Sequence, residues 1–197
     1  MNYEPRTVNY KPYIIFVSIM AAGVSAIFLV SQGYYPIALI QNSFVTARTF
    51  NEEYHAALLF YQNASKTYGS LLSGSSTLTN TEIQASVMDK LVEGEIIRDG
   101  AEKEVGKDLL DELVEGKINK YADDADLTKA AAVLYGLDGK AFIADVLAPE
   151  ATREVLDSRL VLKGEKMGDW LLQAKKSARV IIFSPQFSWD GVEVKSK

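Results

Sequence analysis

The stretch that decides the fold is residues 91–113, LVEGEIIRDGAEKEVGKDLLDEL. Its apolar residues recur at spacings of three and four, which indicates one buried face of an amphipathic helix. Gly106 ends this helix, and the acidic residues Asp108 to Glu112 begin a second one, where the helix dipole favours negative charge. The stretch holds no cysteine or histidine, so we interpret it as a packing element without chemistry of its own. The predicted inner face consists of Leu91, Val92, Ile96, Ile97, Ala101 and Val105.

Further helices are predicted on both sides of this stretch. The sequence Thr79-Asn-Thr-Glu82 is a capping box, which places the start of the central helix just after Thr79. Two apolar tetrads, Ile37–Ile40 and Val180–Phe183, are strand candidates that are too short to stand alone. They could pair with each other and so join the two ends of the domain. The other predicted helices cover 47–68, 108–121, 127–135, 140–147, 149–163 and the segment around Trp170.

An uncharged apolar run lies near the N-terminus, at residues 13–30 (YIIFVSIMAAGVSAIFLV). Eighteen helical residues rise about 27 Å, close to the hydrocarbon thickness of a bilayer. Basic residues precede the run, so the positive-inside rule places the N-terminus in the cytoplasm. We therefore expect a single-pass membrane protein with a cytoplasmic tail (1–12), a transmembrane helix (13–33) and an extracytoplasmic domain (36–197). A cleaved signal peptide and a buried helix are the alternatives.

Composition excludes several classes of function. The net charge is −5, and the basic residues alternate with acidic ones along helical faces, which argues against nucleic-acid binding. Cysteine is absent, which removes disulfides, zinc–thiolate sites and thiol catalysis. The single histidine, His55, lies inside a predicted helix, and Asp123 to Asp126 lack the glycine and the closing glutamate of a calcium loop. No metal, cofactor or catalytic residue is predicted.

Aromatic residues follow one face of the helix predicted over 47–68. Phe50, Tyr54, Tyr61 and Tyr68 recur at helical spacing, with alanines between them. One interpretation is packing in the core. The other is a lining for apolar peptide segments, since aromatic residues are favoured at binding surfaces. On the second interpretation, these four residues and Phe142 are the candidate peptide-binding residues.

The motifs together resemble a chaperone family. Leu91-Val-Glu-Gly-Glu-Ile-Ile97, followed by Ala101, Gly106 and an acidic helix start, resembles a pattern in the N-terminal domains of SurA-, PrsA- and PpiD-type chaperones and prolyl isomerases. Residues 38–46 resemble the opening hairpin of that family, and residues 131–162 resemble its later helical pair. The resemblance covers most of 37–162. The departures are the turn residues Asn42 and Ser43 and the mid-helix glycines Gly94 and Gly100.

The resemblance implies a mainly α fold. It consists of a SurA N-terminal-like helical domain after the transmembrane helix, with a small antiparallel strand pair joining its ends. The parvulin isomerase domain of the family has no counterpart here, since residues 164–168 alone mark its place. The expected function is a membrane-anchored, non-catalytic chaperone-like module that binds unfolded or exported polypeptides. The alternatives are an assembly protein that docks one membrane partner and a divergent peptidyl-prolyl isomerase.

Overall fold

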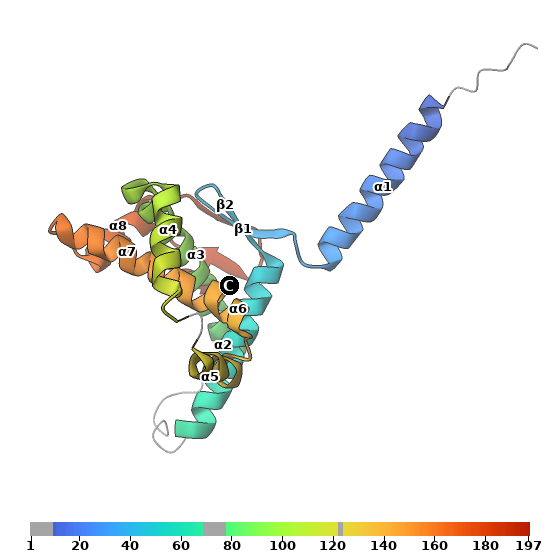
Figure 1. Cartoon of the computed structure of the whole chain (residues 1–197). Helices are drawn as coiled ribbons and strands as arrows, with labels where there is room; N and C mark the ends of the chain where they lie inside the picture. Colours follow the sequence, from blue (N-terminus) through green and yellow to red (C-terminus); the bar gives the residue numbers. More distant parts are fainter. Residues whose placement is uncertain (1–9, 69–77, 122–123) are drawn as a thin grey trace, which may run out of the picture. The chain divides into compact units, whose positions relative to one another are not determined.

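The computed structural model describes residues 10–68, 78–121 and 124–197. The chain divides into two compact units, residues 1–35 and residues 36–197 (Figure 1). In its described residues, the second unit is mainly helical and carries two small antiparallel sheets.

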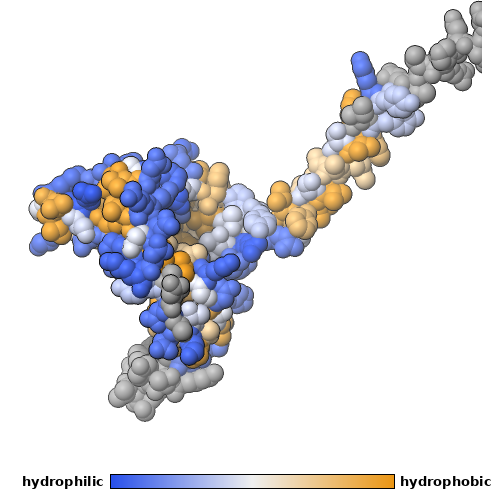
Figure 2. All heavy atoms as spheres, in the orientation of Figure 1, coloured by the Kyte–Doolittle hydropathy of each residue, from blue (hydrophilic) through white to orange (hydrophobic). Residues whose placement is uncertain are grey.

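The first unit contains the helix α1 (Lys11–Ser31), whose described apolar side chains are largely exposed (Figure 2). Among the described residues, no helix combines the length and the apolar character needed to cross a membrane. The predictions of a transmembrane helix over 13–33 and of a single-pass protein with an extracytoplasmic domain are therefore wrong. The apolar run belongs to a helix that begins at Lys11 and includes Ser18, Gly23 and Ser25.

The two ends of the second unit meet in a three-stranded sheet of order β2-β1-β3. The strands β1 (Pro36–Ile40) and β2 (Ser43–Thr46) form a hairpin whose turn begins at Gln41, which has a positive φ of 54°. The strand β3 (Val180–Ile182) runs antiparallel to β1, with Ala38 opposite Ile182. The predicted pairing of the two apolar tetrads is thus confirmed. A second pair, β4 (Phe187–Trp189) and β5 (Val194–Ser196), was not predicted.

The longest helix, α3 (Asn80–Val105), lies at the centre of the second unit and packs against α2, α4, α7, α8 and β5. Its first turn is closed by the predicted capping box. The amide of Glu82 donates to the Thr79 hydroxyl at 3.2 Å, and the Thr79 amide donates to the Glu82 carboxylate at 2.7 Å. Gly106, at a φ of 83°, separates α3 from the next helix. The other helices are α2 (Ala47–Tyr68), α4 (Lys107–Ile118), α5 (Ala125–Tyr135), α6 (Gly139–Phe142), α7 (Ala148–Leu162) and α8 (Met167–Ser177).

A π-helical turn, η1 (Ile143–Leu147), connects α6 directly to α7. The sequence predicts separate helices over 140–147 and 149–163, and Pro149 does lie in the first turn of α7, but the chain stays helical between the two ranges. Proline has no N–H, so in α-helical register it cannot donate to the carbonyl of Asp145. The wider π turn at Ile143–Leu147 accommodates this missing hydrogen bond. Such turns are rare inside helices and occur frequently at functional sites.

Two buried clusters form the core, and α3 contributes to both. Val92 and Ile96 pack with the strands and with α2, whereas Ile97 and Ala101 pack with α4 and α7. Burying a side chain of the size of isoleucine contributes about 1.5–3 kcal/mol, so this face holds the unit together. Trp170 of α8 packs against both clusters.

The helix α8 is fixed to α3 by close packing and by charge. A Cβ atom at Gly100 would collide with the Trp170 indole ring, so the absence of a side chain there lets the two helices approach. Lys175 of α8 is buried, and its ammonium lies 2.9 Å from Glu93 and 3.4 Å from Asp89 on α3. Glu93 also accepts a hydrogen bond from Arg153 of α7 at 2.8 Å. Asp89 accepts one from the Val194 amide of β5 at 3.0 Å.

Candidate functional site

The predicted aromatic face of α2 is divided between two environments. Phe50 and Tyr54 lie at the N-terminal end of α2, in the core cluster beside the strands. Their rings are stacked with centroids 6.3 Å apart, and the Phe50 ring packs against Phe187 at 5.8 Å. Phe50 is only 9% exposed. For this end of the helix, core packing is the interpretation that the contacts support.

Of the other candidate residues, Tyr61 and Tyr68 lie in the C-terminal half of α2, and Phe142 belongs to α6. Tyr61 is 40% exposed, with its ring 5.9 Å from that of Phe60. Phe142 is buried and packs against Tyr135 of α5 at 5.8 Å. The side chain of Tyr68 lies outside the described residues.

An aromatic hollow of about 220 Å³ opens beside Tyr61. Its aromatic wall is the stacked pair Phe60 and Tyr135, whose ring centroids are 5.2 Å apart. Neither residue was predicted as part of a site, because Phe60 lies one position off the predicted stripe and Tyr135 belongs to a different helix. The remaining lining residues are Glu53, Ala56, Ala57, Ile83, Ser86, Val87, Lys90, Leu137 and Val146.

A larger hollow, the α3 groove, has a volume of about 350 Å³. Apolar side chains and glycine make up part of its lining, and charged side chains make up much of the rest. Its walls come from α2, α3, α4, η1 and α7. The lining residues are Thr49, Glu53, Lys90, Leu91, Gly94, Glu95, Arg98, Leu110, Asp111, Val114, Ala144, Asp145, Ala148, Pro149 and Thr152.

The two hollows adjoin along α3. Both are lined by Glu53 and Lys90, which form an ion pair at 3.0 Å between α2 and α3. Consecutive residues of the π turn face different hollows, since Asp145 lines the α3 groove and Val146 lines the aromatic hollow. The arrangement is therefore one track with two hollows, divided by an ion pair.

Gly94 is a lining residue of the α3 groove in the middle of α3. A Cβ atom at this position would meet nothing within 4 Å. Glycine inside a helix costs about 1 kcal/mol relative to alanine, and no neighbouring atom requires it here. Its effect is to leave the groove wide at this turn.

Asp145 has an unusual electrostatic environment within the groove. Burial and the nearby charges of Glu53 and Glu52 raise the pKa of the Asp145 carboxyl, although Lys90 acts in the opposite direction. Among the described residues, the Asp145 carboxylate takes part in no hydrogen bond or ion pair. Asp145 is thus a half-buried carboxylate whose nearby charges include the carboxylates of Glu53 and Glu52.

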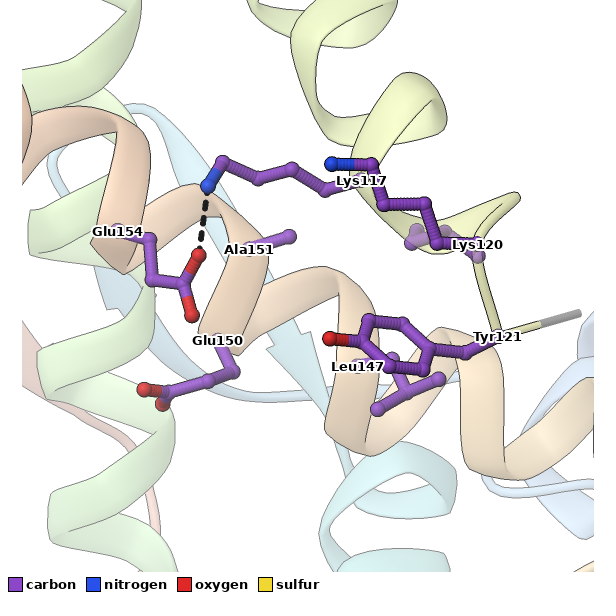
Figure 3. Close-up of a pocket in the computed structure, with 8 residues that line it drawn as sticks. Lys117, Lys120, Tyr121, Leu147, Glu150, Ala151 and Glu154 are labelled. Carbon is purple, nitrogen blue, oxygen red and sulfur yellow. Dashed lines mark hydrogen bonds and ion pairs between the residues drawn. The ribbon is translucent and has the colours of Figure 1, made fainter. Parts of the chain in front are cut away.

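A third hollow, of about 170 Å³, lies between α4 and the start of α7 (Figure 3). Lys117 reaches across Ala151 to Glu154, to which it is ion-paired at 2.6 Å, while Glu150 points away from it. Tyr121 and Leu147 line the other side. Because the Lys117–Glu154 pair crosses this hollow, it offers less open apolar surface than the two hollows along α3.

The described residues include no group of three or more histidine, cysteine or acidic side chains placed to hold a metal ion. His55 is exposed on α2, with its ring 5.9 Å from that of Tyr54. Within the acidic run, Asp124 caps α5 by accepting hydrogen bonds from the amides of Asp126 and Leu127. Asp123 lies outside the described residues.

Compared with known proteins, the chain matches no family model, no curated protein and no solved structure. The resemblance to SurA-type N-terminal domains stays a prediction.

Proposed function

We propose that the unit formed by residues 36–197 is a chaperone-like module that binds unfolded polypeptide segments along the track of two hollows. The observation that carries this proposal is that the aromatic hollow and the α3 groove adjoin and share the Glu53–Lys90 pair. An extended segment with apolar side chains at intervals would bury one in each hollow.

The size and lining of the hollows support this function. The volume of the α3 groove, about 350 Å³, falls within the range of about 300–1,000 Å³ that is usual for ligand pockets. Burial of apolar surface is worth about 25 cal/mol per Å² and is not directional, so it demands no particular sequence. The stacked rings of Phe60 and Tyr135 add a rigid aromatic surface of the kind enriched at binding sites. The resemblance to SurA-type domains agrees with this choice.

The proposal is tested by filling the α3 groove without disturbing the core. In Gly94→Leu, the new side chain enters open space, so the helix is retained while the groove is obstructed. The full-length chain is titrated into a fluorescently labelled, reduced and unfolded model protein, and binding is followed by anisotropy. We expect Gly94→Leu to weaken binding at least tenfold.

The matched control is Gly116→Leu. Gly116 also lies inside a helix, α4, and a Cβ atom there also meets nothing within 4 Å, but it does not line the groove. This variant should bind like the wild-type chain. Equal binding by wild type and Gly94→Leu, with both folded by circular dichroism, would overturn the proposal. So would a folded wild-type chain that binds no unfolded protein and instead captures one stoichiometric folded partner.

A further inference from the structure

The charges around the α3 groove indicate which segments it selects. Resting on the function proposed above, we infer that the groove prefers segments in which a lysine or arginine lies beside an apolar residue, and that Asp145 receives the cation. Four carboxylates and two cations line the groove, so its lining is acidic. The chain as a whole carries a net charge of −5, which favours approach of a basic segment.

The ion pairs of the groove leave two of its carboxylates for an incoming cation. Glu53 is paired with Lys90 at 3.0 Å, and Asp111 is paired with Lys107 at 2.7 Å. The remaining cation of the lining, Arg98, is turned to Glu102 at 3.1 Å. Glu95 and Asp145 complete the set, and neither has an ion pair among the described residues.

Asp145 is the better placed of these two carboxylates. It lies where the two hollows meet, because its neighbour Val146 lines the aromatic hollow. The charged groups that act on it are Glu53 and Glu52 of α2, Asp138 before α6, and Lys90 of α3. Three of these four are acidic, and the one cation is held by Glu53. A cation brought by the bound segment would therefore relieve repulsion that the empty groove maintains.

A basic side chain also suits the apolar part of the lining. Lysine and arginine lay their methylene stems along apolar surface while the charged end remains near water. Leu91 and Val114 offer such surface, and the Asp145 carboxylate lies in the same lining. The π turn holds Asp145 at this position, since Pro149 prevents an ordinary α-helical turn there.

The inference is tested with three labelled peptides of identical apolar pattern that carry Lys, Gln or Glu at one central position. Binding to the full-length chain is measured by anisotropy at pH 7 and low salt. We expect the Lys peptide to bind about fivefold more tightly than the Gln peptide, the effect of a partly exposed ion pair, and the Glu peptide to bind more weakly than both. In Asp145→Asn, the Lys and Gln peptides should bind with equal affinity.

The control for Asp145→Asn is Asp157→Asn, which removes an exposed carboxylate of α7 that does not line the groove. It should leave the Lys preference intact. A Lys preference that survives Asp145→Asn, or equal binding of Lys and Gln peptides to the wild type, would overturn the inference. In those cases, the Gln peptide would still bind in a manner that Gly94→Leu abolishes, so the proposed function would stand. If no peptide binds to the folded chain, the proposed function itself fails.

Discussion

Gly94 and Gly100 lie six residues apart on the same helix, yet their surroundings are opposite. Six residues correspond to a rotation of about 240° around the helix axis, so the two positions belong to different faces. Gly100 lies against the Trp170 ring, with the Leu156 side chain also close. Gly94 faces the open α3 groove and meets nothing.

The role of a mid-helix glycine therefore depends on the atoms that surround it in the fold, which its position in the helix does not reveal. Both glycines cost α3 about 1 kcal/mol relative to alanine. At Gly100, the close approach of α8 offsets that cost, because the ring of Trp170 fills the space of the missing side chain. At Gly94, no packing contact offsets it.

The largest expected effect comes from a variant that breaks the ion pairs between α8 and α3. Lys175→Met removes the buried cation that ties α8, and with it Trp170, to Asp89 and Glu93. Breaking one side of a buried charge cluster costs about 3 kcal/mol, so we expect a loss of that size in the free energy of unfolding, measured by urea titration. Unchanged stability would show that the cluster does not hold α8 in place.

The same variant should show a changed response to acid. Burial acts to raise the pKa of Glu93, but the hydrogen bonds from Lys175 and Arg153 outweigh it and leave that pKa below 4.5. The stabilising contribution of Glu93 is therefore complete above pH 4.5 and is lost as the pH falls through its lowered folded-state pKa. Lys175→Met should lose less stability than the wild type between pH 5 and pH 3.

The next effect tests the fit between Gly100 and Trp170 directly. Gly100→Ala places a methyl group where the ring lies, and overpacking of this kind costs about 1–3 kcal/mol. Better helix propensity returns up to about 1 kcal/mol of that loss. The melting temperature should fall.

The double variant Gly100→Ala/Trp170→Phe isolates the collision. The atoms that the new methyl group would meet belong to the six-membered ring of the indole, and its outer part has no counterpart in phenylalanine. The double variant should therefore be more stable than the sum of the two single changes predicts, as measured by a double-mutant cycle. Strict additivity would mean that Gly100 is not kept for Trp170.

Gly94→Ala should have a smaller effect, and of the opposite sign. The new methyl group meets no atom, so the variant gains helix propensity worth up to about 1 kcal/mol, and its melting temperature should rise. Gly116→Ala in α4 provides the reference gain for an open helical glycine. If Gly94→Ala lost stability while Gly116→Ala gained it, Gly94 would not differ from Gly100 in its tolerance of a side chain.

The smallest effect concerns Asp145, on the groove side. Burial and neighbouring acidic charges raise its pKa, so the ionised carboxylate destabilises the folded state at neutral pH. Asp145→Asn should therefore be more stable than the wild type at pH 7, by about 0.5 kcal/mol or less. The difference should shrink as the pH falls through the raised pKa, because the wild-type carboxyl then becomes neutral. A difference that is constant with pH would exclude this cause.

Sequence reasoning was most successful where a residue acts on its near neighbours in the chain. Thr79 and Glu82 identified the start of α3, and Gly106 identified its end, because caps and breaks depend on residues next to each other in the chain. The pairing of β1 with β3 could also be predicted, because each of the two short apolar tetrads had few other strands with which to pair.

The candidate site was less accessible, because it depends on contacts between distant segments. The periodicity of α2 is the same at Phe50 and at Tyr61, yet one is buried by β4 and the other borders a hollow. The place of Asp145 in the groove could not be predicted from the sequence. It depends on a π turn, and the residues before Pro149 contain no pattern that predicts such a turn. The transmembrane prediction for 13–33 treated the apolar run as sufficient, and it was overturned.

The pairing of β1 with β3 has a consequence for how the protein is made. Ala38 and its partner Ile182 are separated by about 140 residues, so the sheet cannot be completed until residues 180–182 have left the ribosome. Until then, β1 has an unpaired edge, which is a template for strands of other chains. A protein proposed to hold unfolded segments thus passes through a stage of synthesis in which its own first strand is such a segment.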